Sequence, residues 1–151
     1  MSGKTDQTGN PSVIPYIAVD DAARAIEFYK QAFGAVETVR LIGDDGKVSH
    51  AEIRIEGSPL MISDESPADE ALSPRTIGGS PVMIVLDVED ADALFHQAIA
   101  AGASVSRPLQ DSFDGALRTS KVNDPFGHRW MILTRRDPAS LSGQLQQASG
   151  E

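Results

Sequence analysis

An internal repeat constrains the fold of this chain more than any other feature of its sequence. Four short patterns occur twice in the same order, and each second copy follows its first by 68 to 70 positions: Val19-Asp20-Asp21 and Val88-Glu89-Asp90, Gly34-Ala35 and Gly102-Ala103, Asp45-Gly46 and Asp114-Gly115, and 57–62 and 127–132. One such coincidence would carry no weight, but four in order indicate a duplicated unit of about 69 residues. The 151 residues therefore accommodate two half-size units.

Both copies predict the same order of secondary structure elements. A strand precedes a helix, which an Asp can cap at its start and a Gly can end, and three strands follow. The predicted elements are 13–19, 22–33, 36–42, 47–55 and 60–64 in the first copy and 81–87, 91–101, 104–109, 117–122 and 129–134 in the second. This order predicts an α+β fold of two tandem βαβββ modules that form cupped mixed sheets.

The repeat and the composition of the ends together predict the organisation of the chain. We expect a first module over 12–66, a linker over 67–80 and a second module over 81–136. The ends, residues 1–11 and 137–151, are rich in Ser, Gly and Gln and carry little periodic apolar content, so we expect them to be disordered tails.

Charge and composition exclude several classes of function. The chain has 13 basic against 22 acidic residues, a net charge of −9, which is the wrong sign for binding a nucleic-acid backbone. No apolar run approaches the ~20 residues of a membrane span. Cys is absent, so disulfides, thiolate nucleophiles and Cys-ligated zinc are excluded. The first ten residues are polar and lack the apolar stretch of a signal peptide, so we expect a cytoplasmic protein without nucleic-acid or membrane partners.

The predicted strand near residue 50 carries the most suggestive polar residues. Alternation along a strand places Ala51, Ile53 and Ile55 on one face, which must pack on a helix. His50, Glu52 and Arg54 then share the opposite face. Two interpretations remain open at this point: an ordinary solvated sheet face, or the polar wall of a pocket.

Other candidates are weaker. Arg118 follows a Gly-containing turn and could bind an anion or pair with one of the many carboxylates. His96 lies off the apolar stripe of its helix and His128 lies in a turn, so both are expected at the surface. No phosphate-binding loop and no H-E-x-x-H sequence occurs.

Four segments resemble the vicinal oxygen chelate superfamily, which includes glyoxalases, bleomycin-resistance proteins and extradiol dioxygenases, and more specifically its PhnB-like branch. They are 14–35 (IPYIAVDDAARAIEFYKQAFGA), 45–52 (DGKVSHAE), 61–65 (MISDE) and 124–130 (DPFGHRW), and the resemblance spans about 13–135. It implies paired βαβββ modules, a homodimer, and a cavity under each cupped sheet that binds a small organic molecule.

The chain departs from this family at two places. The family's metal-ligand positions, on the first and last strands of each module, correspond to Ile14, Met61, Met83 and Met131, which lack the N and O donors that divalent cations require. We therefore expect no metal and no other cofactor. The family's aromatic-Gly-Asp-Arg run is replaced by 113–118 (FDGALR), which keeps the guanidinium at Arg118 but loses its acidic neighbour.

These observations predict a PhnB-like protein that binds a small organic molecule without metal. The expected polar groups are His50, Glu52, Arg54 and Arg118, and the expected apolar walls are Tyr16, Met61, Met83 and Met131. One alternative is a small-molecule lyase or isomerase that uses Glu52 as a base and His50 as its partner or acid. Another is a metal enzyme with relocated ligands built around His50 and Glu52.

Overall fold

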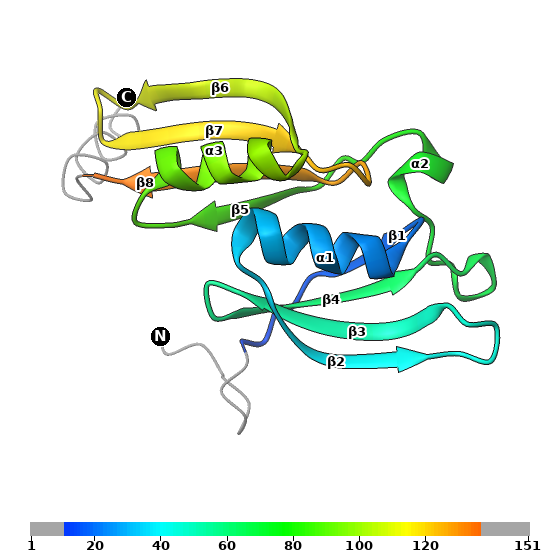
Figure 1. Cartoon of the computed structure of the whole chain (residues 1–151). Coiled ribbons are helices and arrows are strands. Elements are labelled where there is room, and N and C mark those ends of the chain that lie inside the picture. The colour runs from blue at the N-terminus through cyan, green and yellow to red at the C-terminus, as the bar shows by residue number, and fades with distance from the viewer. Residues whose placement is uncertain (1–10, 137–151) are drawn as a thin grey trace. The chain divides into compact units, whose positions relative to one another are not determined.

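The computed structural model describes residues 11–136 and divides the chain into two compact units, which meet in sequence between Ser80 and Pro81. Each unit contains one four-stranded sheet and one long helix (Figure 1). The α+β class and the two mixed sheets predicted from the repeat are confirmed. None of the helices within residues 11–136 is long and apolar enough to cross a membrane.

Both units have the same topology. The first sheet has the strand order β1-β4-β3-β2 and the second has β5-β8-β7-β6, and in each only the outermost pair, β1 with β4 or β5 with β8, is parallel. The elements of the first unit are β1 (Tyr16–Val19), α1 (Ala22–Phe33), β2 (Val36–Ile42), β3 (Val48–Ile55) and β4 (Ser58–Asp64). Those of the second are β5 (Met83–Asp87), α3 (Ala91–Ala101), β6 (Ser104–Ser112), β7 (Leu117–Asn123) and β8 (Arg129–Arg135).

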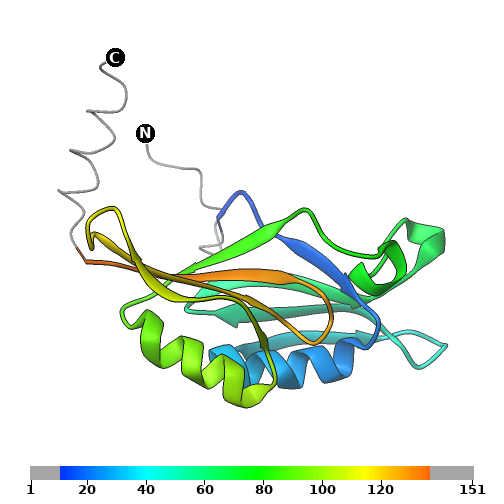
Figure 2. The same ribbon diagram turned by 90° about the horizontal axis from the view of Figure 1, so that it is seen from above.

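The long helices begin and end where their sequences indicate. Asp21 caps α1 by accepting a hydrogen bond from the Arg24 amide at 3.2 Å, and Asp90 caps α3 through the Ala93 amide at 3.0 Å. Gly34 ends α1 with a φ of 68°, a left-handed conformation that glycine adopts without strain. Each helix packs its apolar stripe on one face of its own sheet (Figures 1 and 2). The face of each sheet opposite its long helix is called here the open face.

A side chain at the end of the last strand fixes the start of each helix. Asp64 accepts the Ala22 amide at 2.7 Å through Oδ1 and the Val48 amide at 2.8 Å through Oδ2. In the second unit Thr134 accepts the Ala91 amide at 2.7 Å and donates its own hydroxyl to the Val88 carbonyl at 2.9 Å. Asp64 and Thr134 occupy equivalent positions of the repeat, so the duplication preserves the contact while the residue type changes.

Two predicted strands have different bounds in the structure. The first strand was predicted over 13–19, but β1 begins only at Tyr16. Pro15 has no N–H to donate to a neighbouring strand. Its carbonyl still accepts a hydrogen bond from the Met61 amide at 3.0 Å. The strand predicted over 104–109 extends to Ser112. It tolerates Pro108 because β6 is an edge strand with a register shift between Arg107 and Gln110.

The segment predicted as a linker over 67–80 contains ordered structure. It holds a short 3-10 helix, η1 (Pro67–Asp69), and one helical turn, α2 (Pro74–Ile77), which contacts β1. Glu65 anchors this segment by accepting hydrogen bonds from the Thr76 hydroxyl at 2.7 Å and the Ser73 hydroxyl at 3.1 Å. The Thr76 hydrogen bond, assisted by those from Ser73, lowers the pKa of the Glu65 carboxyl against the opposing effect of desolvation.

Removing the Asp64 carboxylate should destabilise the first unit. Asp64→Ala leaves the part-buried amides of Ala22 and Val48 without their acceptor, and we expect a loss of about 1–3 kcal/mol in the free energy of unfolding. Urea denaturation measures this loss. The control is Asp44→Ala, in an exposed turn where the carboxylate holds no element in place. Equal stabilities of the two variants would contradict the proposed role of Asp64.

Candidate functional site

The open face of the first sheet carries the polar residues predicted from strand alternation. In β3, Ala51, Ile53 and Ile55 are buried on the helix side, while His50, Glu52 and Arg54 are half-buried on the other side. Tyr16 of β1 pairs with Met61 of β4, and Met61 pairs in turn with Glu52. The register therefore places Tyr16, Met61 and Glu52 in one row across three strands.

Tyr16, His50 and Glu52 form a continuous chain of hydrogen bonds on this face. The Tyr16 hydroxyl oxygen lies 2.9 Å from His50 Nδ1, and His50 Nε2 lies 3.1 Å from Glu52 Oε1. The Tyr16 and His50 rings are tilted against each other with centroids 5.5 Å apart. The sequence predicted Tyr16 only as an apolar wall. Its polar contact depends on the pairing of β1 with β4 and of β4 with β3, which no local sequence signal indicates.

The donors and acceptors assign a direction to the hydrogen-bond chain of Tyr16, His50 and Glu52. An ionised Glu52 carboxylate can only accept, so His50 Nε2 must donate to it. In a neutral imidazole Nδ1 then carries no proton and accepts from the Tyr16 hydroxyl. The Tyr16 oxygen keeps lone pairs for a further donor, and Glu52 Oε2 accepts no hydrogen bond from any residue in the described part of the chain.

Arg54 shares the open face but contacts the adjoining turn. Its Nη1 donates to the Gly57 carbonyl at 2.8 Å, in the two-residue turn between β3 and β4. Glu56 and Gly57 of this turn have φ values of 51° and 78°, which is typical of the tightest hairpins. Arg54 thus supports the end of the hairpin that carries His50 and Glu52.

The second unit contains the remaining predicted site residues. Met83 and Met131 are half-buried on its open face, in the positions that correspond to Ile14 and Met61. Arg118 lies on the helix side instead, where Nε donates to Asp92 Oδ1 at 2.9 Å and Nη2 to Asp92 Oδ2 at 3.3 Å. Of the two interpretations given above for Arg118, the structure shows the pairing with carboxylates.

This pairing shifts the pKa of both partners. The Arg118 hydrogen bond and charge lower the pKa of the Asp92 carboxyl, although desolvation opposes the shift. The same contacts raise the pKa of the Arg118 guanidinium, and Asp111 contributes through a third hydrogen bond at 3.3 Å. Because Asp92 belongs to the first turn of α3, the pair ties the helix to β7.

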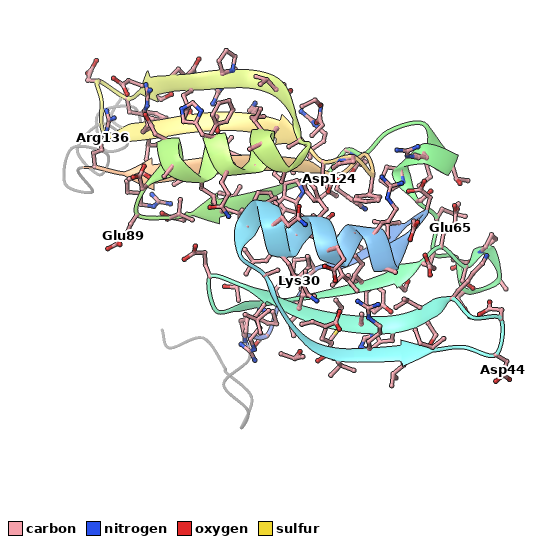
Figure 3. The ribbon with its side chains drawn as sticks, viewed as in Figure 1. Lys30, Asp44, Glu65, Glu89, Asp124 and Arg136 are labelled. Carbon is pink, nitrogen blue, oxygen red and sulfur yellow. The ribbon has the colours of Figure 1, made fainter. Side chains whose placement is uncertain are left out.

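The segment 124–130 has a structural role that the sequence did not reveal. Asp124 is buried in the turn between β7 and β8 (Figure 3). Its carboxylate accepts from the amides of Phe126 and His128 at 2.9 and 3.0 Å, and from the Trp130 indole nitrogen at 2.9 Å. An acidic residue followed by Pro, Gly and Trp is the pattern that could have indicated this turn.

The side chains at the positions that the family resemblance implies as metal ligands do not fit a divalent cation. Ile14, Met61, Met83 and Met131 present no nitrogen or oxygen side-chain atom. Within residues 11–136, His, Asp and Glu side chains form no group of three or more that could hold a metal ion. Tyr16, His50 and Glu52 contact one another as hydrogen-bonding groups.

Comparison with known proteins identifies relatives along nearly the whole described chain. An uncharacterized protein of Mycobacterium bovis is 46% identical over 125 residues, which cover 81% of this chain and 82% of that protein. The crystal structure of TioX from Micromonospora has a TM-score of 0.65 at 27% identity and covers 82% of this chain and 97% of that one.

A PhnB protein of Bacillus cereus shares the fold, with a TM-score of 0.58 at 20% identity over 82% of this chain and 98% of that one. The profile of the Glyoxalase/Bleomycin resistance protein/Dioxygenase superfamily matches residues 9–132. With the duplicated βαβββ topology described above, this match shows that the chain belongs to that superfamily, as the four sequence segments indicated.

Proposed function

We propose that the protein binds a small organic molecule on the open face of its first unit, through Tyr16, His50 and Glu52, without a metal. The observation that carries this proposal is the hydrogen-bond chain from the Tyr16 hydroxyl through the His50 ring to the Glu52 carboxylate. Tyr16 and His50 come from β1 and β3, which are not neighbours in the sheet, so the hydrogen-bond chain spans β4 between them. The fold supplies the platform, and these side chains supply the specificity.

The chemistry of the face indicates the kind of ligand. The Tyr16 oxygen and Glu52 Oε2 are both available as acceptors, so the ligand offers hydroxyl or amine donors. The Glu52 charge disfavours an anionic ligand, which leaves neutral and cationic molecules. Leu41 pairs with His50 and is 54% exposed, and Met61 lies in the row between Tyr16 and Glu52. These apolar side chains favour a ligand with an apolar body.

The same hydrogen-bond chain favours proton transfer as a second candidate function. A carboxylate that orients an imidazole, which in turn contacts a hydroxyl, is the arrangement by which proteins position general acids and bases. Glu52 would act as the base, through the Oε2 atom that His50 does not contact, and His50 would hold the carboxylate in place. Such a protein would be a lyase or isomerase of small molecules.

Replacing the side chain at either end of the hydrogen-bond chain, Glu52 or Tyr16, should weaken ligand binding while leaving the fold intact. We expect Glu52→Gln and Tyr16→Phe each to reduce the affinity for a bound neutral or cationic ligand about tenfold or more. Each should change the free energy of unfolding by less than about 1 kcal/mol. An NMR screen of small hydroxyl- and amine-bearing compounds, with urea denaturation in parallel, measures both effects.

Glu89→Gln, the same change at an exposed position in the second unit, is the control for this screen. An unchanged ligand profile in both site variants would remove the open face of the first unit from the binding site. A loss of stability of about 3 kcal/mol in Glu52→Gln would instead indicate a structural ion pair.

The absence of suitable donors at the family's ligand positions predicts a metal-free protein. Protein purified without a chelator should contain no stoichiometric Ni, Zn, Mn or Fe by elemental analysis, because Ile14, Met61, Met83 and Met131 cannot ligate these ions. About one metal ion per chain, lost in His50→Ala, would contradict this and establish relocated ligands around His50 and Glu52.

We also propose that the chain forms a homodimer, as the family resemblance implies. Edge strands β2 and β6 need cover, and Leu41 and Ile42 of β2 are more than half exposed. A two-fold axis would let two chains cover each other's edges. Light scattering should then report a species near twice the chain mass of 16.1 kDa, whereas a monomer at micromolar concentration would contradict the proposal.

A further inference from the structure

Three positively charged side chains gather on the open face of the second sheet. Trp130, Ile132 and Thr134 of β8 face α3, because two are fully buried and Thr134 binds the first amide of that helix. Strand alternation then places Arg129 and Met131 on the open face. Lys121 of β7 pairs with Met131 and therefore lies on the same face.

Arg107 of β6 belongs to the same group. Its Nη2 donates to the hydroxyl of Thr119, which alternation also places on the open face, and its backbone pairs with that of Lys121. Arg129 pairs with Asn123, two residues along β7 from Lys121. Arg107 and Lys121 are thus directly opposed, about 5 Å apart at the backbone. Arg129 lies on the diagonal from Lys121, about 7–8 Å away. Arg107, Lys121 and Arg129 are called the cationic cluster below.

The cationic cluster lacks the carboxylate partners that other cations of this unit have. Arg118 pairs with Asp92 and Asp111, and Arg135 pairs with Asp87. By contrast, neither Lys121 nor Arg129 forms an ion pair or hydrogen bond through its side chain with any residue of 11–136.

The Arg107 guanidinium is only partly satisfied. It contacts a neutral hydroxyl, and its Nε is buried without a hydrogen-bond partner among the described residues. Like charges on directly opposed strand positions destabilise a sheet, and a buried donor without an acceptor adds a further cost. The chain has 22 acidic residues, yet none of those within residues 11–136 forms an ion pair with Arg107, Lys121 or Arg129.

We propose that the cationic cluster is a binding site for a small organic anion that carries a carboxylate or phosphate group. Two guanidinium groups and one ammonium group offer the charge-assisted hydrogen bonds that such groups accept, and an arginine can bind them in a bidentate manner. Bound anion oxygens would relieve the repulsion between Arg107 and Lys121 and supply an acceptor for the unsatisfied guanidinium.

The apolar neighbours of the cluster define the rest of this ligand. Met83 pairs with Arg129, and Val85 pairs with Met131 beside Lys121, so the charged group of the ligand lies next to apolar side chains. Val85 is 51% exposed and can cover a hydrocarbon portion. The net charge of −9 repels polyanions, which favours a small molecule over a nucleic acid. The cluster belongs to the second unit and shares no residue with Tyr16, His50 and Glu52, so this proposal does not depend on the function proposed for them.

NMR titration of the full, isotope-labelled chain tests the proposal. Inorganic phosphate and benzoate serve as probes, each added at constant ionic strength with chloride as the balancing anion. We expect saturable shifts of the amides in β6, β7 and β8 with at least one probe, and the responding probe distinguishes a phosphate site from a carboxylate site. Lys121→Gln and Arg129→Gln should each weaken this binding about tenfold or more. Lys121→Arg, which keeps the charge, should retain it.

Lys47→Gln, the same change in a turn of the first unit, is the matched control and should leave anion binding unchanged. Without an anion, Lys121→Gln should melt no lower than the unmodified chain, because it removes repulsion rather than a stabilising contact. The proposal is overturned if neither probe gives saturable shifts in β6 to β8. It is also overturned if both Gln variants of the cluster bind as tightly as Lys47→Gln, or if Lys121→Gln melts well below the unmodified chain, which would indicate a structural ion pair.

Discussion

The contact between the last strand and the first turn of the helix underlies the layout of both units. Asp64 in one unit and Thr134 in the other accept the first helical amide, whose N–H has no acceptor within the helix itself. The contact fixes where each helix leaves the sheet, and the apolar stripe then packs on the nearest face. One face of each sheet thereby packs against its helix, and the other carries the polar side chains of the two open faces.

The duplicated positions on the two open faces have acquired different chemistry. Tyr16, His50 and Glu52 of the first unit correspond in the repeat to Val85, Thr119 and Lys121 of the second. The first set forms a hydrogen-bond chain that ends on a carboxylate, whereas the second set brings a hydroxyl and an ammonium beside Arg107. The same backbone geometry therefore carries a carboxylate on the open face of one unit and cations at the corresponding place of the other.

Membership of the superfamily explains the fold but does not assign an activity. The positions that the family resemblance implies as metal ligands carry Ile14, Met61, Met83 and Met131, which offer no nitrogen or oxygen side-chain donor. Several family-like segments prove to be structural in this chain. Asp64 caps a helix, and Asp124 organises the turn that precedes Trp130. Similarity in such segments therefore reports the fold.

The sequence alone determined the local structure and the sidedness of the strands. The repeat, the capping Asp residues and the alternation around Ala51 predicted the βαβββ order and the shared face of His50, Glu52 and Arg54, because these depend on helical and strand periods that operate within a few residues. Which residues from different strands meet was decided only by the tertiary structure. The tertiary structure placed the Tyr16 hydroxyl beside His50 and Arg107 beside Lys121. It placed Arg118 against Asp92 on the helix side of its sheet, not on the open face. Pairing between strands that are distant in sequence depends on packing across the whole sheet, and no local pattern encodes it.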